Sequence, residues 1–182
     1  GRALPAACVR PGAPGVRAVR VGRSAGLGSG PSRAVASRSA LEAADPAFAG
    51  RVRALLSRRK HMPMATTRRD GSPRISGTEV EFSEGQLWIG SMPRSVKGLD
   101  LLRDPRLAIH GPTEDPPADD PSGWKGEAKL AGTATALATK SDGHRFRIEI
   151  QEAVITHLNE AGTRLVVESW NPAGGYRRLE RD

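Results

Sequence analysis

The sequence predicts a mainly β (α+β) protein built around a closed antiparallel barrel of six or seven strands with peripheral helices. Three observations support this prediction. Apolar residues recur at every second position in several segments, turn residues separate these segments at short intervals, and strands do not alternate regularly with helices as they do in parallel sheets. With 182 residues, the chain is long enough for one domain and a terminal segment.

Basic residues are distributed unevenly along the chain. The formal charge is +8, from 28 Lys and Arg against 20 Asp and Glu, yet all seven charged residues of segment 1–40 are arginines. Segment 41–182 therefore carries a charge of about +1, which does not favour a nucleic-acid partner. We assign 1–40 to a disordered basic tail or an over-extended N-terminus, and 41–182 to the folded domain.

Cysteine content and hydropathy predict a reducing, cytoplasmic location. The only cysteine is Cys8, which excludes a disulfide framework and a cysteine-based zinc site. No run approaches the roughly 18 apolar residues of a transmembrane helix, so we expect no membrane partner. An organelle transit peptide within 1–40 is the alternative, because this segment is rich in arginine and free of acids.

The first element of the domain is a helix that begins at Asp45 and Pro46. Asp45 can accept a hydrogen bond at the N-cap, and the ring of Pro46 fixes φ at a helical value. Four apolar residues from Phe48 to Leu56 then share one face of the helix. The basic residues 58–60 fall in its last turn, where the helix dipole favours cations, so they need no ligand.

The remaining elements are mostly extended. Apolar alternation and intervening turns predict a meander of three antiparallel strands, followed by a short helix over 95–103 that stops at Asp104 and Pro105. An acidic, proline-rich loop over 111–123 separates the fourth strand from the later ones. The predicted strands are 61–67, 73–82, 86–90, 107–109, 127–139, 145–158 and 164–170.

The segment between the third strand and the short helix breaks a local rule. Ser95 is the expected N-cap, which places Arg94 and Lys97 at the positive end of the helix dipole, where cations are disfavoured unless an anion lies among them. With the hydroxyls of Ser91 and Ser95 and free backbone N–H groups, they form a credible phosphate site. The alternative is an exposed turn in which both cations point into water.

No other motif points to a particular chemistry. The histidines lack the spacing of a zinc site, so we predict no metal and expect structural or exposed roles for them. Serine-hydrolase, P-loop and Rossmann motifs are absent, and no titratable side chain is singled out as an acid or base. The catalytic residues are therefore unknown. The histidines are His61, His110, His144 and His157.

Several short motifs, in their order and spacing, resemble the pyridoxamine 5′-phosphate oxidase-like split-barrel flavoproteins, and most closely small actinobacterial members of unassigned reaction. The resemblance covers nearly all of 45–182. It implies a six-stranded antiparallel split β-barrel that dimerises and holds FMN, or in some branches a deazaflavin coenzyme, in a groove shared by two subunits. The motifs are Ala65-Thr66-Thr67, Arg69-Asp70-Gly71-Ser72-Pro73-Arg74, Ser91-Met92-Pro93, Ser95-x-Lys97, Arg103-Asp104-Pro105-Arg106, Glu127-Ala128-Lys129-Leu130-x-Gly132-Thr133 and Glu168-Ser169-Trp170-x-Pro172.

The resemblance also implies roles for individual residues. The Ser-x-Lys motif before the short helix binds the cofactor phosphate, and strand 74–78 lies along the ribityl chain and the ring. A tryptophan and an arginine near the C-terminus, here Trp170 and Arg177 or Arg178, approach from the partner subunit. The implied cofactor-binding residues are Arg74, Ser76, Thr78, Ser91, Met92, Ser95, Lys97, Trp170 and Arg178.

Two features depart from the family pattern. Pyridoxamine phosphate oxidases carry an arginine and, five residues later, a lysine in the second strand, whereas this chain has Arg74 and Glu79. We therefore expect a different substrate. Relatives also have a longer segment before the strand at Phe146, where this chain has only 140–145. The shorter connection opens or reshapes the substrate side of the groove.

These observations predict a homodimeric, FMN-binding oxidoreductase that performs hydride transfer on an unidentified small molecule, with the flavin carrying the chemistry. A deazaflavin-dependent reductase is one alternative. A non-catalytic flavin or haem carrier or sensor is another, with His61 or His110 as an axial haem ligand. Neither a nucleic acid nor a membrane is expected as a partner.

Overall fold

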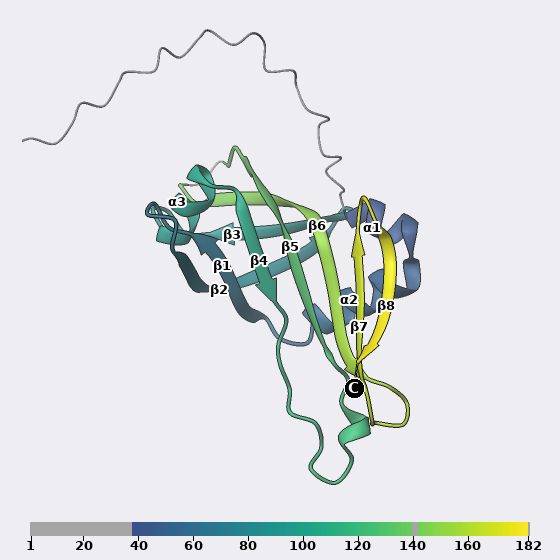
Figure 1. Ribbon diagram of the computed structural model, residues 1–182. Helices are drawn as coiled ribbons and strands as arrows, with labels where there is room; N and C mark the ends of the chain where they lie inside the picture. The colour runs from purple at the N-terminus through teal and green to yellow at the C-terminus, as the bar shows by residue number, and fades with distance from the viewer. Residues whose placement is uncertain (1–37, 140–141, 182) are drawn as a thin grey trace, which may run out of the picture. The chain divides into compact units, whose positions relative to one another are not determined.

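The computed structural model describes residues 38–139 and 142–181 (Figure 1). The predicted tail lies outside these residues, apart from its last three. Residues 38–40 belong to a helix, α1, that sequence analysis did not predict, so the expected domain boundary at 40/41 falls inside a helix. Leu41 of this helix is buried in the core.

The strands form a single antiparallel sheet in the described part of the chain. Its order is β3-β2-β1-β4-β5-β6-β7-β8, and an additional pairing of β3 with β6 closes the first six strands into a barrel. The elements are α1 (Arg38–Ala44), α2 (Pro46–Leu56), β1 (His61–Thr67), β2 (Pro73–Ser83), β3 (Gln86–Ser91), α3 (Val96–Arg103), β4 (Arg106–His110), the 3-10 helix η1 (Pro121–Gly123), β5 (Glu127–Leu137), β6 (His144–Leu158), β7 (Leu165–Asn171) and β8 (Gly175–Arg181).

This architecture confirms the predicted mainly β fold and the six-stranded antiparallel barrel with peripheral helices. β6 makes the closure possible because it is 15 residues long. Its first part pairs with β3, and its second part pairs with β7, which continues the sheet beyond the barrel to β8. Sequence analysis missed β8, since nearly all of its residues are exposed and it therefore lacks alternating apolar residues.

The barrel interior and the inner face of α2 form the core. Alternate residues of the barrel strands are buried. α2 packs against β5 and β6 through its own buried residues Phe48, Val52 and Leu56. Asp45 is the N-cap, as predicted, and its carboxylate accepts a hydrogen bond from the Phe48 N–H at 2.9 Å. The helix ends at Leu56, so basic residues 58–60 follow it rather than forming its last turn.

The two ends of the barrel carry different helices. Figure 1 shows α3 at one end, and α2 beside β7 and β8 at the other. Of the apolar residues on α3, Leu101 is buried, whereas Val96, Leu99 and Leu102 are about half exposed. No helix in the described residues is long and apolar enough to cross a membrane.

Candidate functional site

A groove of about 630 Å³ lies between β2, β3 and the start of α3. It brings together two segments that sequence analysis assigned to one site, the middle of the second strand and the turn before the short helix. Four other predicted residues lie outside its wall. The predicted residues that line it are Thr78, Ser91, Met92, Ser95 and Lys97.

The first turn of α3 forms one end of this groove. Ser95 is its N-cap, as predicted: the hydroxyl accepts a hydrogen bond from the Gly98 N–H at 3.2 Å and contacts the hydroxyl of Ser91. Nζ of Lys97 donates a hydrogen bond to the carbonyl oxygen of Gly77 on β2 at 2.5 Å. Two hydroxyls, an ammonium group and a helix N-terminus make this end favourable for an anion.

Arg94 does not join Lys97 in this wall. Its φ is 55°, a left-handed conformation that costs a non-glycine residue about 1–3 kcal/mol. The side chain is exposed and does not line the groove. Of the two cations, only Lys97 therefore lines the groove, while Arg94 has the exposed position of the alternative interpretation.

His144 lies beside the same turn of α3, although sequence analysis expected a structural or exposed role for it. It faces Ser91 across the β3–β6 pairing. A Cβ atom at Gly98 would lie 2.7 Å from Cδ2 of His144, 2.9 Å from Oγ of Ser95 and 3.2 Å from Oγ of Ser91. Three polar side chains thus converge on one point of the helix that only a glycine leaves open.

Nε2 of His144 is buried and has no hydrogen-bond partner among the described residues. Buried polar atoms are normally satisfied, so an exception needs an explanation. His144 is not part of the groove wall; its ring packs against the first turn of α3, beside the hydroxyls of Ser91 and Ser95. The sequence could not reveal it, because only barrel closure brings His144 to the start of α3.

The opposite end of the groove carries two carboxylates, and each is paired with a basic side chain; Glu79 lies 3.3 Å from Nζ of Lys60. Glu79, which stands where the flavoprotein pattern has a lysine, lies 2.9 Å from Nε2 of His61. Glu81 lies 3.7 Å from the guanidinium of Arg145, which in turn stacks 4.6 Å from the ring centre of Trp88. The groove therefore carries a lysine at one end and two carboxylates with an indole ring at the other.

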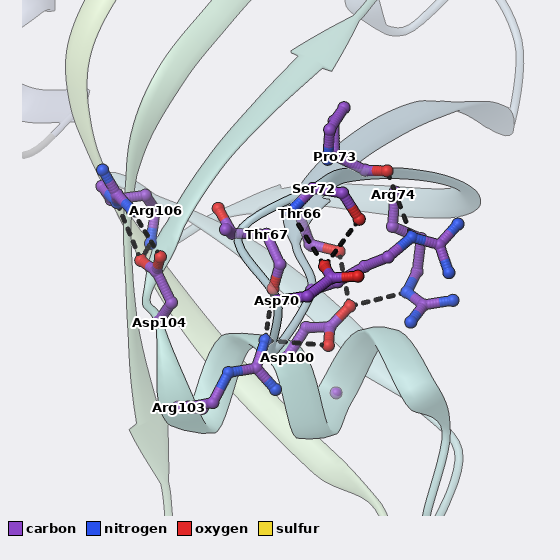
Figure 2. Close-up of polar contacts among 12 residues, drawn as sticks. Thr66, Thr67, Asp70, Ser72, Pro73, Arg74, Asp100, Arg103, Asp104 and Arg106 are labelled. Atoms are coloured by element: carbon purple, nitrogen blue, oxygen red, sulfur yellow. Dashed lines mark hydrogen bonds and ion pairs between the residues drawn. The ribbon is translucent and has the colours of Figure 1, made fainter. Parts of the chain in front are cut away.

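Arg74 lies outside the groove wall and links β2 to α3. Its Nε donates a hydrogen bond at 2.6 Å to the buried carboxylate of Asp100 on α3, which also accepts hydrogen bonds from Thr66 and Arg103 at 3.0 Å (Figure 2). Burial opposes ionisation of Asp100, but these donors outweigh it and hold its pKa below the usual value. The cluster fixes α3 against β1 and β2.

The two histidines considered as haem ligands both face protein oxygens. Nε2 of His61 faces Glu79, and Nδ1 of His110 lies 2.7 Å from the carbonyl oxygen of Gly111. Among the described residues, no three His, Cys, Asp or Glu side chains gather closely enough to hold a metal ion.

The sequence of the chain matches a known family over most of its length. A family model for pyridoxamine 5′-phosphate oxidase matches residues 48–168. The chain belongs to the pyridoxamine 5′-phosphate oxidase family. The resemblance seen in its motifs is thus confirmed. No curated protein matches the sequence.

Two solved structures share this fold at low sequence identity. One is a pyridoxamine 5′-phosphate oxidase-related, FMN-binding protein from Nostoc punctiforme, with a TM-score of 0.53 and 12% identity, covering 76% of this chain and 96% of that chain. Another is PhzG from Burkholderia lata 383 in complex with tetrahydrophenazine-1-carboxylic acid, with a TM-score of 0.53 and 10% identity, covering 74% of this chain and 88% of that chain. At these identities, the likeness concerns the fold.

The remaining residues predicted from the family pattern do not reach the groove within one chain. Ser76 is half-buried on β2, outside the wall. Trp170 on β7 is 3% exposed and belongs to the core of its own chain. Arg178 on β8 is exposed and pairs with Glu180 at 2.6 Å.

Glu168, which sequence analysis noted only within a family motif, is the centre of a second polar cluster. It is buried and accepts hydrogen bonds from Arg51 on α2 and, at 2.6 Å, from the hydroxyl of Tyr176 on β8. Nε2 of His157 lies 2.7 Å away. Burial raises the pKa of Glu168, but these three partners outweigh it and lower the pKa to about 2.

Proposed function

We propose that the protein is a homodimeric, FMN-binding oxidoreductase of the cytoplasm that performs hydride transfer on an unidentified small molecule. The observation that carries the proposal is the convergence of Ser91, Ser95 and Lys97 on the groove at the first turn of α3. Family membership supports FMN as the occupant of the groove. When bound, FMN supplies the hydride-transfer chemistry.

The α3 end of the groove would hold the phosphate of FMN. Lys97 is already held in place by its hydrogen bond to Gly77, so ordering it on the phosphate costs little further side-chain entropy. Ser95 can turn its hydroxyl toward an anion while the helix N-terminus favours negative charge. Each charge-assisted hydrogen bond formed there contributes about 1.5–3 kcal/mol.

The other end of the groove would face the substrate. Glu79 pairs with Lys60 at 3.3 Å and Glu81 with Arg145 at 3.7 Å, so this end offers carboxylate oxygens as hydrogen-bond acceptors without a large net charge. A glutamate at position 79, where pyridoxamine phosphate oxidases carry a lysine, supports a substrate other than pyridoxamine 5′-phosphate. Trp88, fixed by Arg145 and by a hydrogen bond from its Nε1 to the carbonyl oxygen of Ser83, provides an apolar wall beside the carboxylates.

Exposed apolar side chains around the groove support a dimer. Ile75 on β2 and Met92 before α3 are each 78% exposed, and the outer face of α3 adds three more apolar residues. Such patches typically mark interfaces. A six-stranded barrel is also too narrow to enclose a flavin, so a second subunit is needed to cover it. We propose that Arg178 reaches the cofactor from that subunit.

The cofactor can be identified from the purified protein. The protein is produced in a host that makes both FMN and the deazaflavin coenzyme, and its absorption spectrum is recorded. The mass of the released ligand is then measured by mass spectrometry. We expect FMN at close to one per subunit. A released deazaflavin would assign the protein to the deazaflavin-dependent reductases, and a haem Soret band would replace the oxidoreductase proposal with a haem carrier or sensor.

Electron transfer is tested separately from binding. If FMN is bound, adding a nicotinamide donor under anaerobic conditions should bleach the flavin absorbance. Bound FMN that no donor reduces would support a carrier rather than an oxidoreductase.

A further inference from the structure

A second cavity, of about 320 Å³, lies between α2, the segment before β5 and the last part of β6. It shares no lining residue with the groove. Its apolar surface comes from Leu55 and Ile155, which are buried core residues, and from the half-buried ring of Trp124. We call it the basic cavity, because of the side chains at its rim.

The ionisable side chains that line the basic cavity are three cations and a histidine, namely Arg51, Arg58, Lys125 and His157. No carboxylate lines it. The cofactor groove differs in this respect, since Glu79 and Glu81 are part of its wall. The rim of the basic cavity is therefore suited to a negatively charged group.

Nearby acids neutralise only part of this charge. Glu168 binds Arg51 and His157, and Glu114 lies 3.5 Å from Arg58. Within the described residues, Lys125 has no ion pair. Its charge, together with N–H groups of Arg58 beyond the Nη1 that binds Glu114, remains available to a ligand.

The walls of the basic cavity are held in place before any ligand binds. Nε1 of Trp124 donates a hydrogen bond to the carbonyl oxygen of Glu114 at 2.8 Å. Gly126 has a φ of +78°, and a Cβ atom there would lie 2.5 Å from the carbonyl oxygen of Thr156, so only glycine lets this segment lie against β6. A site fixed in this way loses little entropy when a ligand enters.

We infer that the basic cavity binds a small organic anion, a carboxylate attached to a single apolar ring. The carboxylate would pair with Lys125 and Arg58, and the ring would lie between Trp124 and the apolar floor formed by Leu55 and Ile155. A volume of about 320 Å³ is at the lower end of the range for ligand pockets, which fits a ligand of this size. The site would be a binding site separate from the FMN groove.

Calorimetric titration of the full-length protein with benzoate tests this inference, with benzyl alcohol as the uncharged probe of similar shape. Lys125→Met removes the charge at the rim. Lys129→Met is the matched control, because Lys129 is partly exposed on β5 and does not line the cavity. We expect benzoate to bind the wild type and the control equally. Lys125→Met should weaken binding about tenfold or more, and benzyl alcohol should bind at least about tenfold more weakly, as expected for loss of one charge-assisted contact.

Three results would overturn the inference. They are an absence of benzoate binding, equal weakening by both lysine variants, and displacement of benzoate by FMN, which would place benzoate in the groove. FMN affinity is measured on the same preparations. If benzoate does not bind but FMN does, the proposed function stands. If FMN does not bind but benzoate does, the inference about the basic cavity stands.

Discussion

The imidazole ring of His144 lies against Gly98 in the first turn of α3, so close that a Cβ atom at Gly98 would be 2.7 Å from Cδ2 of the ring. β6 supplies the histidine and α3 the glycine, and the two meet only because β3 pairs with β6 and closes the barrel. This contact connects the closure of the fold to the end of the groove where we place the phosphate of FMN.

Gly98→Ala tests this contact. Alanine favours a helix over glycine by about 1 kcal/mol, so a simple propensity effect would stabilise the protein. We expect destabilisation by about 1–3 kcal/mol instead, since the added methyl group must displace His144 and the hydroxyl of Ser95. Urea unfolding measures the change. An increase in the free energy of unfolding would show that the ring moves aside freely.

Lys97→Ala tests the phosphate contact. Loss of one charge-assisted hydrogen bond should weaken FMN binding about ten- to a hundredfold while leaving the fold intact. FMN fluorescence quenching gives the affinity, and circular dichroism checks the fold. Lys129→Ala serves as the control because this lysine lies outside the groove. Equal affinities of the two variants would remove Lys97 from the site.

The lowered pKa of Glu168 predicts that the protein loses part of its free energy of unfolding in acid. Its pKa is about 2 in the folded chain against an ordinary value of 4.5. Its contribution is therefore complete above about pH 4.5 and is lost as the pH falls toward 2; the shift corresponds to about 3 kcal/mol. Glu168→Gln should be less stable than the wild type at pH 7, and the gap should narrow below pH 4.5. A gap that is constant from pH 7 to pH 2.5 would contradict this assignment.

The exposed outer face of α3 allows a test of the proposed dimer. Leu102→Glu places a charge on the exposed apolar face beside the groove and should shift the protein toward a monomer in sedimentation velocity, with weaker FMN retention. Leu165→Glu is the control, because this leucine is also partly exposed but lies on β7. A Leu102→Glu protein that sediments like the control would locate the interface elsewhere.

Local patterns in the sequence were sufficient to predict most of the barrel. Alternation placed β1 to β7, and cap chemistry placed Asp45 and Ser95 at the starts of α2 and α3. β8 was not predicted because its residues are nearly all exposed and show no apolar alternation. α1 was not predicted because it contributes mainly one residue, Leu41, to the core.

Local chemistry predicted the part of the candidate site whose residues are neighbours in the chain, and the family resemblance added Thr78. Ser91, Ser95 and Lys97 lie within seven positions of one another, so helix-start chemistry revealed them. Asp100 and His144 depend on partners brought together by the tertiary structure. The ion pair of Arg74 with Asp100 spans 26 positions, and His144 meets Ser91 only through barrel closure. The local periodicity of apolar residues in the sequence does not indicate such contacts.

The most direct test of the phosphate site is a paired titration of the cofactor-free protein with FMN and with riboflavin, which differ only in the phosphate. If the first turn of α3 binds that phosphate, FMN should bind at least about a hundredfold more tightly than riboflavin, because two or more charge-assisted hydrogen bonds are at stake. Equal affinity for the two flavins, or no binding of FMN, would contradict the assignment of the groove.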